Sequence, residues 1–158
     1  MTKILAHAFL AALLTTGAAI AAGNAADPVI GTWTLDAAKS TFTAGPAVKD
    51  QTRTYSKSDK GTTAAIKTVG ADGKEYTTET TYLFDGKDYP VTGNPMYDGI
   101  SGRQVNSHTA TFTLKRGGKA VGTTRRRVSQ DGKTLTATLK LTDASGEKTD
   151  NVMVFNKQ

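Results

Sequence analysis

Beyond residue 28 the chain alternates short segments of β-branched and aromatic residues with tight-turn signals. The turn signals contain Asp-Gly, Gly-Gly, Ser-Gly or Asp-Lys-Gly, and glycine supplies the positive φ angles that hairpin turns require. They lie at residues 59–61, 72–73, 85–86, 117–118, 131–132 and 145–146. No stretch places apolar residues at a sustained period of about 3.6 residues, so the pattern predicts many strands and few, short helices.

The segments between the turns are rich in Thr, Val, Ile, Tyr and Phe, which suit a pleated and half-wet surface. We expect strands at residues 29–35, 51–57, 62–69, 75–84, 88–91, 99–105, 109–115, 120–129, 134–141 and 149–155. Hairpins join nearly all of them, and pairing the first strand with the last would remove the exposed edges. The pattern therefore predicts an all-β fold, a single antiparallel up-and-down β-barrel of about eight to ten strands.

Two connections are longer than hairpin turns: Asp36 to Asp50, which contains Pro46, and Pro90 to Tyr97, which contains two prolines. We expect both at the barrel mouth or across one end. The second is also a candidate portal loop, because it can position Tyr89 or Asn94 over the mouth.

The N-terminus carries one cation, Lys3, followed by an Ala/Leu-rich run from Ile4 to Leu14 and a stretch of small residues. This is the pattern of a secretory signal peptide. A membrane-spanning helix would need roughly 20 mostly apolar residues, and this run is shorter. We predict a signal peptide over residues 1–25, with cleavage near Ala25 or Ala26, and hence a periplasmic or secreted protein.

Residues 26–158 are then expected to form one β-barrel domain, a monomer without stable membrane insertion. The sequence contains no cysteine, which excludes a lipid-anchored first residue and a disulfide scaffold. Loss of Lys3 lowers the net charge of +6 by one. The remaining excess is spread along the chain without a basic stripe of interleaved aromatics, so we expect a small anionic partner and no nucleic acid.

Few residues in the chain can support catalysis or metal binding. After residue 25 the only histidine is His108, which excludes His-based metal sites and Cys-His nucleophile pairs. No Gly-x-Ser-x-Gly elbow occurs. The Asp-Gly-Lys triplets at 72, 85 and 131 lack the alternating carboxylates of a calcium loop and are expected to be turns. We expect no catalytic residues, metal or cofactor.

Arg125, Arg126 and Arg127 lie within one expected strand, where consecutive side chains alternate between faces. Either Arg126 points into the barrel or its two neighbours do. We prefer Arg126, because that choice leaves two charges outside. The expected hairpin partner has an apolar inner face of Leu135, Ala137, Leu139 and Leu141. A buried guanidinium needs partners: it can close one barrel end against a carboxylate, a tyrosine or Trp33, or it can bind the anionic group of a ligand.

Other side chains share the expected inner face. Arg53 has the same parity as Tyr55, and Tyr76 the same parity as Tyr82, whereas Glu79 faces outward. The expected ligand contacts are Arg126, Arg53, Arg103, Tyr55, Tyr76, Tyr82 and Tyr89. The alternative is that side chains fill the interior, since a barrel of about eight strands is near the size at which they just do so.

Gly31-Thr32-Trp33 holds the only tryptophan of the chain, on the inner face of the first strand. We expect Trp33 to be a structural plug, with Gly31 permitting a close bend. Gly31-Thr32-Trp33-Thr34-Leu35, with Lys39-Ser40, resembles the first strand of calycins. Together with Asp85-Gly86-Lys87-Asp88-Tyr89-Pro90 and Asp131-Gly132-Lys133, the chain resembles exported bacterial lipocalin-like proteins of unassigned function.

The lipocalin resemblance implies that Trp33 closes one barrel end and packs against Arg125, Arg126 or Arg127. The chain departs from the pattern because it ends on an expected strand, whereas lipocalins usually add a helix there. The leading hypothesis is a binding protein for a small amphiphilic, anionic ligand inside the barrel. One alternative is an envelope interaction protein or inhibitor that uses the barrel as scaffold. The other is a barrel enzyme, which needs an inward acid such as Glu79 or Asp98 near a tyrosine.

Overall fold

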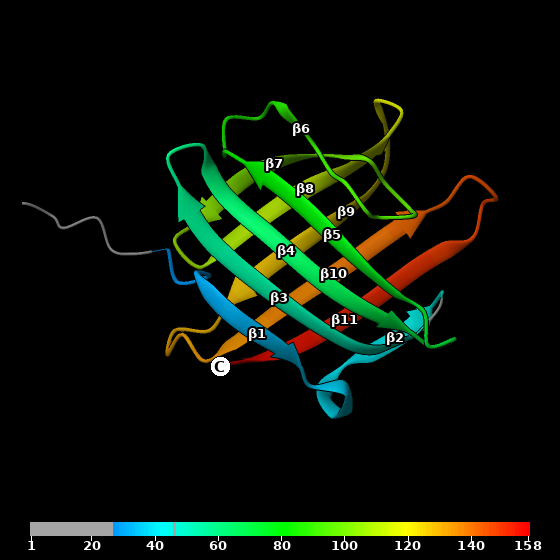
Figure 1. Cartoon of the computed structure of the whole chain (residues 1–158), viewed down its shortest axis with the longest axis horizontal. Coiled ribbons are helices and arrows are strands. Elements are labelled where there is room, and N and C mark those ends of the chain that lie inside the picture. The colour runs from blue at the N-terminus through cyan, green and yellow to red at the C-terminus, as the bar shows by residue number, and fades with distance from the viewer. Residues whose placement is uncertain (1–26, 46) are drawn as a thin grey trace, which may run out of the picture.

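The computed structural model describes residues 27–45 and 47–158 (Figure 1). The predicted signal peptide over residues 1–25 and its cleavage site lie outside the described residues. The described part contains eleven strands and one short 3-10 helix, η1. The strands are β1 (Gly31–Leu35), β2 (Thr41–Ala44), β3 (Val48–Ser58), β4 (Gly61–Gly70), β5 (Glu75–Tyr82), β6 (Asp88–Pro90), β7 (Gly99–Asn106), β8 (Thr109–Arg116), β9 (Lys119–Val128), β10 (Thr134–Thr142) and β11 (Lys148–Lys157), and η1 spans Ala37–Lys39.

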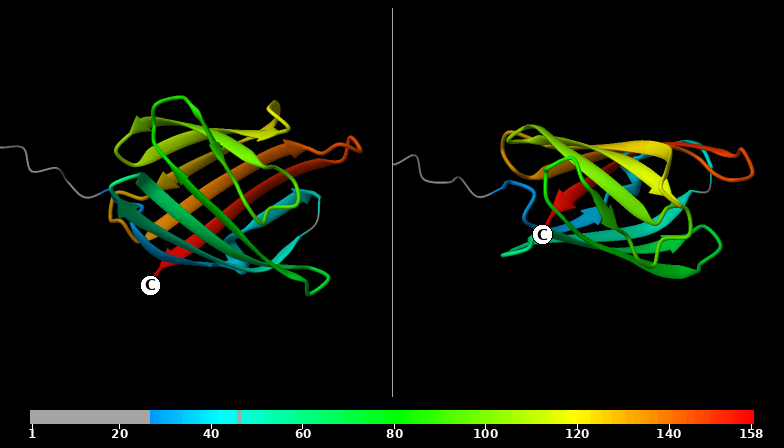
Figure 2. Two further views of the ribbon diagram at one scale, coloured as in Figure 1. Left: turned by 45° about the horizontal axis from the view of Figure 1, so that its top comes forward. Right: turned by 90° about the horizontal axis from the view of Figure 1, so that it is seen from above.

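The strands form one antiparallel sheet in the order β5-β4-β3-β1-β11-β10-β9-β8-β7-β6, and Figures 1 and 2 show this sheet curled into a barrel. The first strand pairs with the last, as expected, with Trp33 opposite Lys157. The sheet closes through a short bridge between Glu79 and Thr92, whose backbone groups exchange two hydrogen bonds of 3.0 Å. The predicted all-β, antiparallel barrel is therefore confirmed, with its weakest pairing between β5 and the segment after β6.

All ten expected strands are present, with ends that differ by up to three residues. The connection from Asp36 to Asp50 contains two elements that the pattern did not predict. Asp36 caps η1 by accepting the amide of Lys39 at 3.2 Å, and β2 then pairs with β11 beyond a register shift between Asp150 and Asn151. Both are too short to leave a periodic signal.

Trp33 points into the barrel core, as its strand parity predicted. Its side chain is fully buried, and its indole N–H donates to the carbonyl of Val29 at 2.7 Å. Gly31 has a φ of +132°, and a Cβ there would lie 2.9 Å from the Lys157 side chain. The amino group of Lys157 lies 5.1 Å from the Trp33 ring centroid. The cation over Trp33 is thus Lys157 and not an arginine of residues 125–127, because the β1–β11 register sets Lys157 beside it.

Candidate functional site

The barrel interior is open. A cavity of about 550 Å³ extends from the aromatic side chains around Arg126 to a mouth formed by the β4–β5 turn, the chain before β3, and the segment 91–97. A volume of this size is within the range of small-molecule sites. Much of its wall is apolar, formed by Val48, Ala64, Ile66, Val91, Ile100, Leu114, Leu139 and Met153. The alternative in which side chains fill the interior is therefore wrong.

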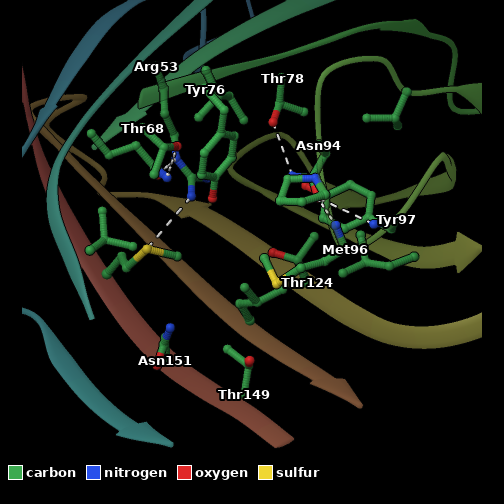
Figure 3. Close-up of a pocket in the computed structure, with 18 of the residues that line it drawn as sticks. Arg53, Thr68, Tyr76, Thr78, Asn94, Met96, Tyr97, Thr124, Thr149 and Asn151 are labelled. Atoms are coloured by element: carbon green, nitrogen blue, oxygen red, sulfur yellow. Dashed lines mark hydrogen bonds between the residues drawn. The ribbon is translucent and has the colours of Figure 1, made fainter. Parts of the chain in front are cut away.

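Arg53 is a buried charged residue of this wall (Figure 3). Only 8% of its surface is exposed. Its Nε donates to Gln51 at 2.7 Å, and Gln51 in turn donates to the Thr68 hydroxyl at 2.8 Å. The Arg53 guanidinium also stacks 4.5 Å from the Phe155 ring centroid, and its Nη2 lies 4.0 Å from the sulfur of Met153.

These partners of Arg53 are all uncharged. No Asp or Glu in the described part of the chain forms an ion pair with it, and no hydrogen bond of its Nη1 is present there. A buried charge without a counter-charge is costly to the fold. Arg53 can therefore accept an anionic group that enters the cavity, and its flat donor array suits a carboxylate or a sulfonate.

Tyrosine side chains line the cavity near Arg53. Tyr55 and Tyr76 are there, as expected, and Tyr97 joins them from the segment after β6. Burial raises the pKa of Tyr97 to about 12, while the positive charge of Arg53 acts in the opposite direction. The Tyr97 phenol therefore stays protonated at neutral pH and can donate a hydrogen bond to a ligand. Tyr97 was missed as a site residue, although the expectation of a portal loop at 90–97 included it.

The segment 91–97 is held over the mouth by Asn94. The Asn94 side chain donates to the Thr78 hydroxyl at 3.0 Å and accepts the amides of Met96 and Tyr97 at 2.9 and 3.3 Å (Figure 3). Gly93 permits the approach to β5, because a Cβ there would lie 1.9 Å from the carbonyl oxygen of Thr77. The expected place of this loop at the mouth is confirmed.

Tyr89 does not line the cavity, and that part of the prediction is wrong. β6 is the outermost strand of the sheet, so Tyr89 packs against the edge of the core instead. Partial burial, with a hydrogen bond to Asp85, raises the pKa of Tyr89.

Arg126 points into the barrel, whereas Arg125 and Arg127 are exposed, as the alternation predicted. Its Nη1 donates to the Tyr82 hydroxyl at 2.7 Å, and its Nη2 lies 3.9 Å from an Asp27 carboxylate oxygen. The guanidinium carbon is 5.0 Å from the centroid of the Tyr55 ring. Burial raises the pKa of Tyr82 to about 12, against the opposing charge of Arg126. Arg126 and Tyr82 line the cavity, but their strongest partners are each other.

Arg103 is exposed on the outer face of β7, and its predicted place in the cavity is wrong. Ile100 and Gly102 face inward on this strand. Gly102 lies against Phe112, where a Cβ would come within 2.8 Å of the ring. This aromatic contact sets the parity of β7, so Arg103 points to the outside.

The remaining acidic residues do not build a second site. Glu79 is exposed, as expected, and the exposed Asp98 accepts the amide of Gly117 at 3.0 Å. The Asp-Gly-Lys triplets are turns in which Asp72, Asp85 and Asp131 accept the following lysine amide at 3.0–3.1 Å. No group of three or more potential metal-ligating side chains occurs within residues 27–45 and 47–158. In the same ranges no helix is long and apolar enough to cross a membrane.

Fold and site together define an antiparallel β-barrel with an internal, mostly apolar cavity and, among residues 27–45 and 47–158, one buried arginine without a counter-charge. No model of a protein family matches the chain, and no curated protein matches it significantly. The cavity is therefore the feature from which a function can be inferred.

Proposed function

We propose that this protein binds a small amphiphilic anion inside its barrel, outside the cytoplasm, with the anionic group on Arg53 and the apolar part against the cavity wall. The observation that carries the proposal is the cavity of about 550 Å³ with Arg53 buried in its wall and no carboxylate paired to it in the described residues. The resemblance to lipocalin-like proteins, noted from the Gly-x-Trp strand, agrees with this role.

The walls indicate an amphiphile and not a simple inorganic anion. Apolar side chains of β4, β8 and β10 cover much of the cavity, and burying an apolar group against them is favourable by about 25 cal/mol per Å². The polar groups gather near Arg53, where Gln51 and Thr68 hold the guanidinium in place. Such pre-organisation lowers the entropy cost of binding an anion.

A matched pair of fluorescent probes tests the proposal. 8-Anilinonaphthalene-1-sulfonate and N-phenyl-1-naphthylamine share a ring system, and only the first carries an anion. We expect the folded protein to bind the sulfonate at one site. We expect Arg53→Met to weaken that binding by roughly tenfold or more, since a hydrogen bond to a charged group contributes about 1.5–3 kcal/mol. Binding of the neutral probe should change little.

Arg125→Met is the control, because Arg125 is an exposed arginine on the outer face of β9. It should leave the affinity for both probes unchanged. Absence of binding, or sulfonate binding that Arg53→Met does not weaken, would overturn the proposal. Native mass spectrometry of protein purified from the periplasm of its own bacterium then identifies what the cavity holds.

A second candidate is an interaction protein that uses the outer barrel face. The supporting observation is the set of exposed arginines, Arg103, Arg125 and Arg127, none of which forms an ion pair within the described chain. Thr111 lies between Arg103 and Arg125 in the strand register. Salt-dependent retention on an immobilised polyanion, lost when all three are changed to Gln, would favour this candidate. The open cavity makes it the weaker of the two.

A further inference from the structure

Two buried polar residues on β11, Thr149 and Asn151, form another part of the cavity wall, across from Arg53 in Figure 3. Their exposed fractions are 7% and 2%. They alternate with outward-facing residues, so Thr149, Asn151 and Met153 point to the same side of the strand. Neither residue takes part in binding the anion as proposed above.

Hydrogen bonding fixes the orientation of the Asn151 carboxamide. Its Nδ2 donates to the carbonyl oxygen of Asp150 at 3.0 Å and to that of Ala44 at 3.1 Å, and the opposite orientation would set Oδ1 against these two acceptors. Both carbonyls lie at the register shift where β2 meets β11. Both hydrogens of the carboxamide nitrogen are therefore donated to backbone carbonyls.

The other end of the carboxamide points into the cavity. Figure 3 draws the Asn151 nitrogen toward the cavity. The two hydrogen bonds to backbone carbonyls require the opposite assignment, so the Asn151 atom nearer the cavity is Oδ1. The two hydrogen bonds that the Asn151 carboxamide makes in this orientation both belong to its nitrogen, and no hydrogen bond of the Thr149 hydroxyl is present within the described chain. The wall thus presents an acceptor beside a hydroxyl that can act as donor or acceptor.

The strand gives the spacing between this acceptor and the anion position. Nη2 of Arg53 lies 4.0 Å from the sulfur of Met153. Strands rise about 3.3 Å per residue, so Asn151 lies roughly 7 Å, and Thr149 roughly 13 Å, farther along β11 toward the mouth. A ligand whose anion rests on Arg53 passes both residues when its body extends toward the mouth.

We propose that the ligand carries, in addition to its anion, an uncharged hydroxyl in the middle of its body, which donates to Oδ1 of Asn151 and contacts Thr149. This inference rests on the proposed function. An apolar chain at this position would displace water from Asn151 without replacing its hydrogen bond, whereas a hydroxyl would replace it. Sites with buried hydrogen-bonding groups reject analogues that lack the matching group, which makes this wall a determinant of specificity.

Three fatty acids test the inference on the unchanged protein: octadecanoic acid, its isomer hydroxylated at mid-chain, and its isomer hydroxylated next to the carboxylate. Their affinities are measured by displacement of the anionic fluorescent probe. We expect the mid-chain hydroxy acid to bind at least tenfold more tightly than the plain acid. The isomer hydroxylated next to the carboxylate should show no such preference, because its hydroxyl lies at Arg53 and not at Asn151.

Variants then test whether Asn151 and Thr149 cause the preference for the mid-chain hydroxy acid. We expect Asn151→Leu to bring the plain and mid-chain hydroxylated acids to similar affinity, and Thr149→Val to reduce the preference severalfold. Thr149→Val is isosteric and keeps the backbone contacts of Asn151, so it serves if Asn151→Leu fails to fold. Thr124→Val is the matched control, because the Thr124 hydroxyl lines the cavity but already donates to the carbonyl of Thr138 at 2.8 Å. It should leave the preference intact.

The outcomes separate the two proposals. If the plain acid and the mid-chain hydroxy acid bind equally well, the hydroxyl subsite is wrong and the anion site at Arg53 stands. If the preference survives both Asn151→Leu and Thr149→Val, the assignment to β11 is wrong. If none of the three acids displaces a probe whose binding depends on Arg53, the hydroxyl subsite is wrong and the proposed function stands. If the probe itself does not bind, the proposed function is wrong as well.

Discussion

Arg53 and Arg126 are two buried arginines in the same barrel, with nearly equal exposed fractions of 8% and 6%. Both stack on aromatic rings, at 4.5 Å from Phe155 and 5.0 Å from Tyr55 respectively. They differ in their polar partners. Arg126 has a carboxylate and a phenol, whereas the partners of Arg53 in the described chain are an amide oxygen and a thioether.

The polar partners give Arg126 a place in the fold and leave Arg53 as the candidate for the proposed binding role. Burial by itself would lower the pKa of Arg126, but the nearby Tyr82, Tyr55 and Asp27 outweigh it and raise that pKa. The charge of Arg126 is therefore stabilised by the fold. No carboxylate of the described residues pairs with Arg53, and under the proposed function a ligand would supply the counter-charge. The polar partners, more than the depth of burial, distinguish the two.

The largest expected effect is on Arg126. We expect Arg126→Met to lower the free energy of unfolding by about 3 kcal/mol, because it leaves the buried Tyr82 hydroxyl and Asp27 without their partner. Urea denaturation with an unchanged m-value measures the loss. The control Arg125→Met changes an exposed side chain and should stay within about 0.5 kcal/mol of the unchanged protein. A loss of stability no larger than that of the control would show that Arg126 does not stabilise the fold.

The second effect is a loss of stability at high pH. The pKa of Tyr82 is about 12 in the folded protein, against an ordinary value of 10.0. Between these values the unfolded chain has lost the proton and the folded protein keeps it, so stability is fully present below pH 10 and falls as pH rises through 12. Each pKa unit is worth about 1.4 kcal/mol, which gives a loss of about 2–3 kcal/mol.

Denaturation at a series of pH values measures this loss, and the ultraviolet absorbance of phenolate follows ionisation. Tyr97, with a pKa of about 12, should add to the late-titrating fraction. Titration of all tyrosines near pH 10 in the folded protein would contradict the burial of Tyr82 and Tyr97.

A smaller effect is expected for Tyr82→Phe at neutral pH. The substitution removes the hydroxyl that Arg126 donates to and leaves Asp27 in place. We expect a loss of about 2 kcal/mol, less than for Arg126→Met, and a shallower decline of stability above pH 10. If Tyr82→Phe costs as much as Arg126→Met, the ion pair with Asp27 contributes nothing. Both variants are compared by urea denaturation at neutral pH.

Strand alternation made much of this comparison predictable from the sequence. Arg126 was expected inward because its strand neighbours cannot share its face, and Arg53 because it shares a face with Tyr55. The same reasoning failed for Arg103, since Gly102 gives no sign of which face it occupies until Phe112 is known to pack on it. Asn151 shares parity with Met153, so alternation would have found it, but nothing local reveals that its nitrogen is held by β2.

Contacts between distant segments were not predictable. Tyr97 reaches the cavity because Asn94 binds Thr78 across the mouth, and Lys157 covers Trp33 because of the register of β1 and β11. Neither contact leaves a periodic signal in the sequence. The open interior could not be predicted from the sequence either, since it depends on how ten strands curve and not on which residues face inward.

The smallest expected effect on stability is that of Arg53→Met. It is also the result that distinguishes Arg53 most clearly from Arg126. We expect Arg53→Met to change the free energy of unfolding by no more than about 1 kcal/mol in either direction, because removing a buried charge that no carboxylate compensates offsets the loss of its bond to Gln51 Oε1, while Gln51 keeps its bond to Thr68. Urea denaturation without ligand measures this. With a saturating anionic ligand, the unchanged protein should gain stability and the variant should gain much less. A loss of several kcal/mol without ligand would instead mean that Arg53, like Arg126, serves the fold.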